Sequence, residues 1–260
     1  MTSMYVAMSV LRELIGERWL ETYIVYGAKK KNVLTLIEAD PASETAGQLR
    51  LMDLAEMMYN LQPVPGFFDC LDRMREGEIE GVLAELNLGR MLYWHGIPLR
   101  YVERTGRQGD DYDMVFQFPN GMYRCADAKC KVNGRRFSAK SLENTLKKGR
   151  GQLPKDKPGV LFVKHPTVWL DEPDFVERLR DIAYDFLRTT ERVVSVKYYV
   201  EPITLVDGFA HQRLGFKEFS KTKTQFGDDI NWDLFKPGGD FTKPKKWQRL
   251  FNFPDGIPEA

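Results

Sequence analysis

Residues 109–131, GDDYDMVFQFPNGMYRCADAKCK, decide the fold that the sequence predicts. Two extended runs, at 112–118 and 122–132, flank the turn Pro119-Asn120-Gly121, and Asn-Gly is a strong signal for a short hairpin. We therefore expect two antiparallel strands here, with the polar side chains that carry chemistry placed on them.

The hairpin brings acidic and basic side chains together. Because side chains alternate between the two faces of a strand, Asp127 and Lys129 share one face and Ala128 points away. Asp113 opens the preceding strand, and the hairpin returns the chain to that end, so we expect Asp113 to approach Asp127. The spacing predicts a shared site.

The flanking segments alternate between helix and strand. Apolar residues recur at helical spacing before the hairpin, and a further helix separates each pair of later apolar strands. Helices are expected at 76–95, 138–152 and 174–188, and further strands at 97–104, 160–165 and 193–206. This order predicts an α/β protein with a mixed sheet covered by helices.

Helix-breaking prolines and glycines and changes in periodicity divide the chain into three regions. Residues 1–70 have a mainly helical pattern, and the stretch QPVPGFF from Gln62 interrupts it. Residues 71–206 hold the alternating elements. Residues 207–260 are rich in aromatics, glycine and lysine with weak periodicity, so we expect an irregular C-terminal extension.

Composition excludes several classes of protein. The 38 Lys and Arg residues nearly balance the 37 Asp and Glu residues, and hydrophobic residues make up 43% of the 260, so a disordered or highly charged chain is excluded. Three cysteines without a CxxC pair predict neither a disulfide framework nor a structural zinc site. No apolar run reaches membrane-spanning length, and we expect a cytoplasmic protein with no membrane partner.

Crowded carboxylates require a counter-charge. Two carboxylates about 4 Å apart repel by roughly 4 kcal/mol at an effective dielectric of 20, so a proton or a cation must lie between them. Carboxylate oxygens without histidine or thiolate suit Mg²⁺ or Mn²⁺, which also bind phosphate oxygens. Lys129 would then orient or help deprotonate the water that attacks a phosphodiester.

This arrangement resembles the PD-(D/E)XK nuclease superfamily, whose fold is similar to that of type II restriction endonucleases, over about residues 76–165. In that family the site consists of a helical Glu, an Asp at the start of a hairpin strand, and an acidic residue, any residue and Lys on the next strand. Tyr112 stands where the family has its eponymous Pro, which is a departure from the pattern. The resemblance implies a restriction-endonuclease-like core.

The resemblance also implies roles for individual residues. The implied catalytic residues are Glu85, Asp113, Asp127, Lys129 and, in support from the helix that follows, Gln152. The implied metal ligands are Glu85, Asp113, Asp127 and Ala128.

Other residues compete for these roles. Asp127 and Lys129 would also suit an ordinary solvated strand face. The alternatives to individual site residues are Glu78 or Glu80 for Glu85, Asp111 for Asp113, and Lys131 for Lys129.

A basic segment follows the hairpin. Residues 129–157 contain ten basic and two acidic side chains, a local net charge of +8 in a chain of +1, and a polyanion would dock there. Residues 171–191 have seven acids and three bases instead. The expected nucleic-acid contacts are Lys131, Arg135, Arg136, Lys140, Lys147, Lys148 and Arg150.

The sequence thus predicts a Mg²⁺- or Mn²⁺-dependent endonuclease. DNA rather than RNA is expected because of the family resemblance, and a homodimer would allow both strands to be cut. The second hypothesis is a catalytically silent nuclease-like module that binds nucleic acid or protein. The third is a structural or interaction protein that uses its helical N-terminal region.

Overall fold

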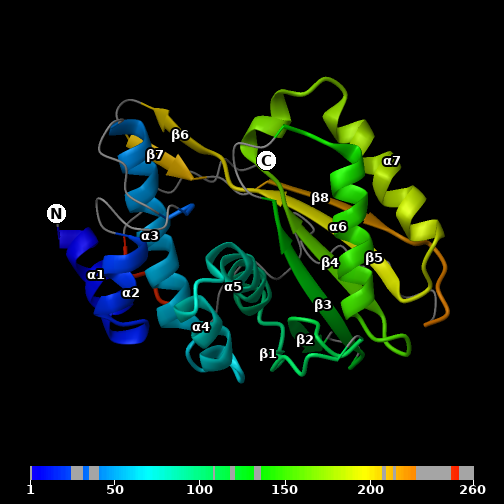
Figure 1. Ribbon diagram of the computed structural model, residues 1–260, viewed down its shortest axis with the longest axis horizontal. Coiled ribbons are helices and arrows are strands. Elements are labelled where there is room, and N and C mark those ends of the chain that lie inside the picture. Colours follow the sequence, from blue (N-terminus) through cyan, green and yellow to red (C-terminus); the bar gives the residue numbers. More distant parts are fainter. Residues whose placement is uncertain are drawn as a thin grey trace.

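A six-stranded mixed sheet with the order β1-β2-β3-β4-β5-β8 forms the centre of the protein (Figure 1). The computed structural model describes residues 2–24, 32–34, 41–107, 109–117, 121–131, 136–206, 209–212, 215–226 and 247–251. The strands are β1 Leu99–Tyr101, β2 Met114–Gln117, β3 Tyr123–Cys130, β4 Gly159–Lys164, β5 Val193–Val200, β6 Ile203–Val206, β7 Phe209–Gln212 and β8 Gly215–Ser220. The predicted α/β class with a mixed sheet is confirmed at this level.

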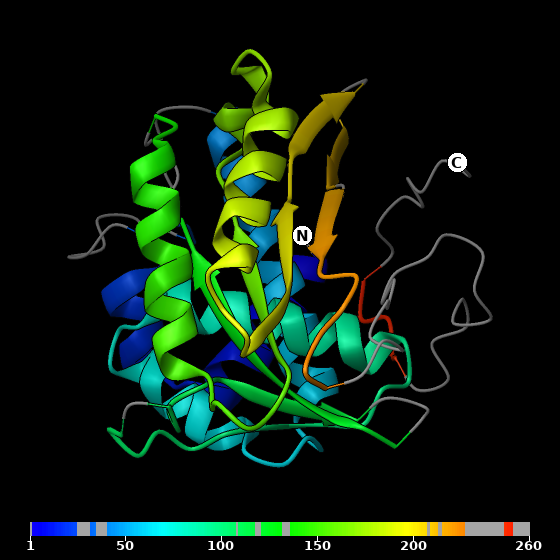
Figure 2. The same cartoon turned by 90° about the vertical axis from the view of Figure 1, so that its right-hand side faces the viewer.

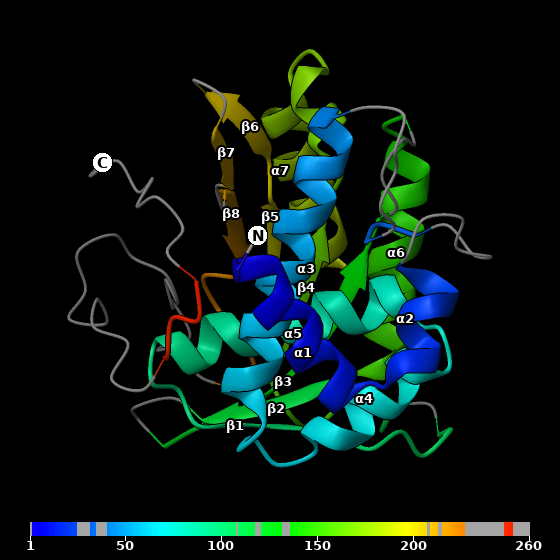
Figure 3. The same cartoon turned by 90° about the vertical axis from the view of Figure 1, so that its left-hand side faces the viewer.

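Helices cover both faces of the sheet. They are α1 Thr2–Leu14, α2 Glu17–Tyr23, α3 Pro41–Leu61, α4 Phe67–Arg75, α5 Ile79–Trp94, α6 Ala139–Gln152 and α7 Phe175–Arg188, with a 3₁₀ turn, η1, at Thr167–Asp171. Helices α6 and α7 lie in front of one face in Figure 2, and the N-terminal helices lie in front of the other in Figure 3. A separate hydrophobic core fills each side.

The predicted hairpin is confirmed. Strands β2 and β3 pair antiparallel, with Met114 opposite Ala126 and Gln117 opposite Tyr123. Pro119 and Asn120 lie outside the described residues, but Gly121 adopts a positive φ of 82°, which glycine tolerates without strain. Strand β3 then pairs parallel to β4, and β4 parallel to β5, with helical crossovers between them.

Helix α5 lies between the sheet and the other N-terminal helices. The sequence predicted a helix with one apolar stripe, but α5 is buried over most of its circumference because α3 and α4 cover the side away from the sheet. Its polar residues Glu85, Asn87 and Arg90 are therefore buried as well. Each of them must find a partner inside the protein.

The expectation of an irregular segment after residue 206 is wrong for residues 209–212 and 215–220, which form strands. Strand β7 pairs with β6, and β8 pairs antiparallel with β5 at the edge of the main sheet. The backbone groups along one side of β8 pair with β5, which precedes it by about 20 residues, and Phe219 packs into the core beside α7. Residues 227–246 and 252–260 of the expected extension lie outside the described residues.

A short C-terminal segment, residues 247–251, docks on α3. Glu56 accepts hydrogen bonds from the indole Nε1 of Trp247 (2.7 Å) and the backbone nitrogen of Leu250 (3.0 Å). Asn60 exchanges two hydrogen bonds with the backbone of Gln248, at 2.6 and 2.9 Å. Trp247 stacks on Trp94 of α5. Side chains of α3 thus recognise the backbone of a distant segment.

No described helix combines the length and the apolar composition needed to cross a bilayer.

Candidate functional site

The ends of β2 and β3 hold the two aspartates that the sequence singled out. Continuing the register by one residue beyond Met114 and Ala126 places Asp113 beside Asp127. Both residues are almost completely buried, at 2% and 0% exposure. Buried carboxylates are costly unless they are paired or bind a cation, so the partners of each oxygen decide what the site can do.

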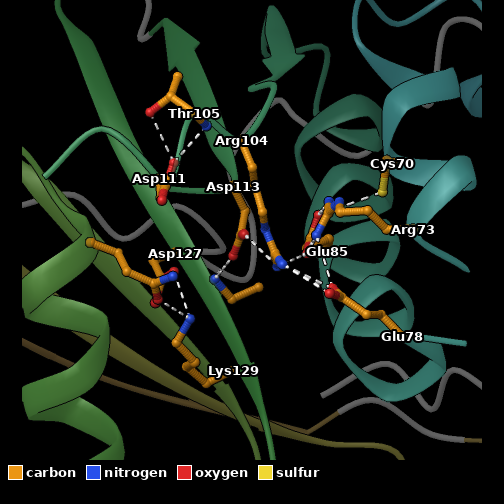
Figure 4. Close-up of polar contacts among 12 residues, drawn as sticks. Cys70, Arg73, Glu78, Glu85, Arg104, Thr105, Asp111, Asp113, Asp127 and Lys129 are labelled. Carbon is orange, nitrogen blue, oxygen red and sulfur yellow. Dashed lines mark hydrogen bonds and ion pairs between the residues drawn. The ribbon is translucent and has the colours of Figure 1, made fainter. Parts of the chain in front are cut away.

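Asp127 pairs with Lys129, as the strand alternation predicted. The Lys129 Nζ donates to Asp127 Oδ1 at 2.7 Å and to the Oε1 of Gln152 at 2.5 Å. Gln152 is the last residue of α6, so the crossover helix brings it to the strand. The structure thus gathers three of the expected catalytic residues on the side of the sheet that α6 covers, and Figure 4 shows two of them, Asp127 and Lys129, next to each other.

The second oxygen of Asp127 lies against helix α6. A β-carbon added to Gly149 would be 2.7 Å from Asp127 Oδ2, so the helix can approach this closely only because residue 149 is glycine. Asp127 Oδ2 has no hydrogen-bond donor among the described residues. Burial, and then the charge of Asp113, raise the pKa of Asp127 well above its ordinary value, although Lys129 lowers it.

Asp113 points away from α6. Its Oδ2 accepts a hydrogen bond from the backbone nitrogen of Ala128 at 2.7 Å, just beyond the last regular pair of the β2–β3 ladder. Its Oδ1 faces the guanidinium of Arg104, whose Nη2 is 3.9 Å away, and receives no hydrogen bond from the described residues. In Figure 4 Asp113 points toward Arg104 and Glu85, while Asp127 points toward Lys129. The carboxylates of the two aspartates therefore point to different sides of β3.

Glu85 is next to Asp113 but is occupied. Arg73 of α4 donates to both of its oxygens, with Nη1 2.7 Å from Oε1, and the thiol of Cys70 lies 3.5 Å from Oε2. Burial, and then the charge of Asp113, raise the pKa of Glu85 to about 7, and Arg73 acts in the opposite direction. Glu85 thus belongs to the same buried cluster, yet both of its oxygens already have donors.

Sequence reasoning missed Arg73 and Arg104. Arg104 follows β1, and its Nη1 lies 2.9 Å from Oε2 of Glu78, while its Nη2 lies 3.6 Å from Oε1 of Glu85. Arg104 is the last residue of the expected strand 97–104 and Arg73 precedes the expected helix 76–95, and neither position carries a signal of its partners in the sequence. Their contacts depend on how α4 and the β1–β2 connection pack against α5.

The alternative residues have other partners. Asp111 accepts hydrogen bonds from the backbone nitrogens of Thr105 (2.7 Å) and Gly106 (2.9 Å), so it holds the β1–β2 connection. Glu78 precedes α5 at the surface and pairs with Arg104. Lys131 donates to the backbone and the hydroxyl oxygen of Ser141, both at 3.0 Å, at the start of α6.

The expected nucleic-acid contacts divide into two groups. Arg136, Lys140, Lys147 and Lys148 are exposed. Arg150 instead donates to the carbonyl oxygen of Thr189 at 3.3 Å and lies over the ring of Phe186 on α7. Arg135 lies outside the described residues.

The donor set suits a hard divalent cation only in part. In the described parts of the chain, no three His, Cys, Asp or Glu side chains form a group that could hold a metal ion. Mg²⁺, however, keeps several waters and is commonly bound through one or two carboxylates plus substrate phosphate. Asp113 and Asp127 each keep one buried oxygen without a hydrogen-bond donor, which is the chemistry such an ion requires.

No protein-family model matches the chain, and a search of curated proteins finds no relative.

Proposed function

We propose that the protein is a Mg²⁺- or Mn²⁺-dependent nuclease that hydrolyses phosphodiester bonds, with DNA as the expected substrate. The observation that carries this proposal is the pair Asp113 and Asp127, neighbours in register and buried, each with a carboxylate oxygen that lacks a donor. The pKa of Asp127 is raised well above its ordinary value, and groups with strongly perturbed pKa values cluster at functional sites.

Asp113 and Asp127, neighbours in register, would hold the cation, and this requires the carboxylate of Asp113 to turn from the side of Arg104 toward that of Asp127. When bound, the ion would neutralise the charge that develops on the phosphodiester and make a neighbouring water more acidic. The ion would also remove the repulsion that the two aspartates exert on each other.

Lys129 would position the attacking water. Its ammonium group is fixed by two acceptors, Asp127 Oδ1 and Gln152 Oε1, and its side chain is 22% exposed, so its third donor can reach solvent. Asp127 and Gln152 together fix the direction of the lysine side chain. A lysine held in this way donates a hydrogen bond to the water or to a phosphate oxygen.

The test is cleavage by the purified protein of plasmid, linear duplex, single-stranded DNA and RNA, with Mg²⁺, Mn²⁺ or EDTA. We expect metal-dependent cleavage, and a loss of about 100-fold or more for Asp113→Asn, Asp127→Asn and Lys129→Met.

Matched controls remove the same charges from exposed positions. Asp110→Asn lies in the connection that precedes β2, and Lys217→Met lies on β8. Both should keep wild-type activity. Cleavage that persists in EDTA or in Asp127→Asn would reject the proposed mechanism.

A catalytically silent binding module is the second candidate. It is favoured by the charge compensation inside the cluster, where Lys129 neutralises Asp127 and Arg73 neutralises Glu85 without any metal. A wild-type protein that binds nucleic acid in Mg²⁺ but leaves every substrate intact would select this candidate.

A further inference from the structure

Arg104 lies where three acidic side chains converge. Its guanidinium contacts both oxygens of Glu78 at 2.9 and 3.2 Å, and its Nη2 is 3.6 Å from Glu85 Oε1 and 3.9 Å from Asp113 Oδ1. Only the contact with Glu78 has hydrogen-bond geometry. Toward Glu85 and Asp113, Arg104 acts as a nearby positive charge.

The cluster has one more negative than positive charge. Glu78, Glu85 and Asp113 are acidic, and the basic members are Arg73 and Arg104. Arg73 donates two hydrogen bonds to Glu85, and the Arg73 side chain is 15% exposed. The positive charge that faces the unpartnered oxygen of Asp113 is therefore that of Arg104.

We propose that Arg104 is an internal counter-ion that competes with the divalent cation for Asp113. This inference rests on the proposed function, because it concerns the same cluster of carboxylates. Asp113 Oδ1 is buried, lacks a hydrogen-bond donor in the described structure and faces Arg104, so a cation that binds this oxygen must displace the guanidinium or be repelled by it.

The geometry provides a place for the displaced arginine. Glu78 lies at the surface with its side chain 48% exposed, and it already holds Arg104 by two hydrogen bonds. The Arg104 side chain is itself 36% exposed. Arg104 can therefore withdraw toward Glu78 and solvent without leaving a buried charge unpaired, whereas Arg73 cannot.

The experiment measures Mn²⁺ binding to the full-length protein by electron paramagnetic resonance, without nucleic acid. Arg104→Gln should tighten Mn²⁺ binding by about tenfold, which corresponds to roughly 1.4 kcal/mol. Arg107→Gln removes the same charge from an exposed position in the same connection and should change the affinity far less. Asp113→Asn in the Arg104→Gln background should abolish the gain.

Glu78 gives a test with the opposite sign. Glu78→Gln removes the carboxylate that draws Arg104 away from Asp113, so Mn²⁺ binding should weaken severalfold, while Glu80→Gln in the first turn of α5 should have a smaller effect. In the Arg104→Gln background the effect of Glu78→Gln should shrink to that of Glu80→Gln. A double-mutant cycle isolates this coupling from the general effect of removing a charge.

The outcomes separate this inference from the proposed function. Equal or weaker Mn²⁺ binding by a folded Arg104→Gln protein overturns the competition, even if the wild type cleaves DNA. Failure of both the wild type and Arg104→Gln to bind Mn²⁺ also overturns it. Tighter binding by Arg104→Gln in a protein that cleaves nothing supports the competition and rejects the nuclease.

Discussion

Gly149 of α6 lies directly against the carboxylate of Asp127, and a β-carbon at this position would be 2.7 Å from Oδ2 and 2.8 Å from Cδ2 of Leu161. The buried carboxylate of Asp127 can therefore lie against α6 only because residue 149 has no side chain. Because α6 approaches the strand this closely, Gln152 at its end reaches Lys129. The contact between Gly149 and Asp127 therefore helps to position Lys129 and Gln152.

We expect Gly149→Ala to destabilise the protein by about 1–3 kcal/mol, because overpacking outweighs the higher helix propensity of alanine. Urea unfolding measures this change. The matched control is Gly81→Ala in α5, where an added β-carbon meets nothing within 4 Å. The control should be neutral or up to about 1 kcal/mol more stable, and a stabilised Gly149→Ala protein would contradict the close contact.

The raised pKa of Asp127 predicts a specific pH dependence of stability. The native state binds this proton at pH values where the unfolded state has already lost it, so the free energy of unfolding falls as pH rises from about 4 toward the native pKa. The fall is at most about 1.4 kcal/mol per pH unit. Asp127→Asn lacks this contribution.

Urea titrations between pH 4.5 and 7.5 test that expectation. The free energy of unfolding of Asp127→Asn minus that of the wild type should increase with pH in this range, whether or not the variant is less stable overall. A wild-type-minus-variant difference that does not change with pH would mean that Asp127 titrates normally.

The exposed lysines of α6 predict the salt dependence of nucleic-acid binding. Replacing Lys147 and Lys148 by glutamine should weaken binding and reduce the slope of log K against log salt by about 1.8, if each contacts one phosphate of duplex DNA. Fluorescence anisotropy at several salt concentrations measures the slope. Replacing Arg180 and Arg188 on the acidic helix α7 removes the same charge and should leave the slope unchanged. Equal slopes for wild type and the lysine variant would exclude this docking surface.

The contacts of residues 247–251 predict a role for Glu56. Glu56→Ala leaves the indole of Trp247 and the backbone nitrogen of Leu250 without their acceptors, so we expect a loss of about 1–3 kcal/mol and faster hydrogen exchange at Leu250. Glu13→Ala on the exposed side of α1 is the control. Unchanged exchange at Leu250 would show that the segment is held by its aromatic side chains alone.

The sequence predicted the parts of the site that depend on local spacing. Asp127 and Lys129 share a strand face because they are two residues apart, and the hairpin follows from alternation and a turn. The role of Gln152 was implied only by the family resemblance, and Gln152 reaches Lys129 because helix α6, which follows β3, ends beside that strand.

The rest depends on packing that no local pattern encodes. Asp113 leaves the face that alternation assigns to it, because the ladder is irregular there and its carboxylate binds the Ala128 nitrogen instead. The surroundings of Glu85 depend on Arg73 and Arg104, which come from two other segments. Strand β8 was missed because its stability comes from pairing with β5 rather than from its own composition.

The docking of residues 247–251 on α3 also bears on the order in which the protein forms during synthesis. The hydrogen-bond partners of Glu56 and Asn60 lie about 190 positions later in the chain. The N-terminal helices therefore emerge from the ribosome long before these hydrogen bonds can form. Until then Trp94 lacks the ring that stacks on it, and the nascent chain exposes an aromatic surface that the folded protein covers.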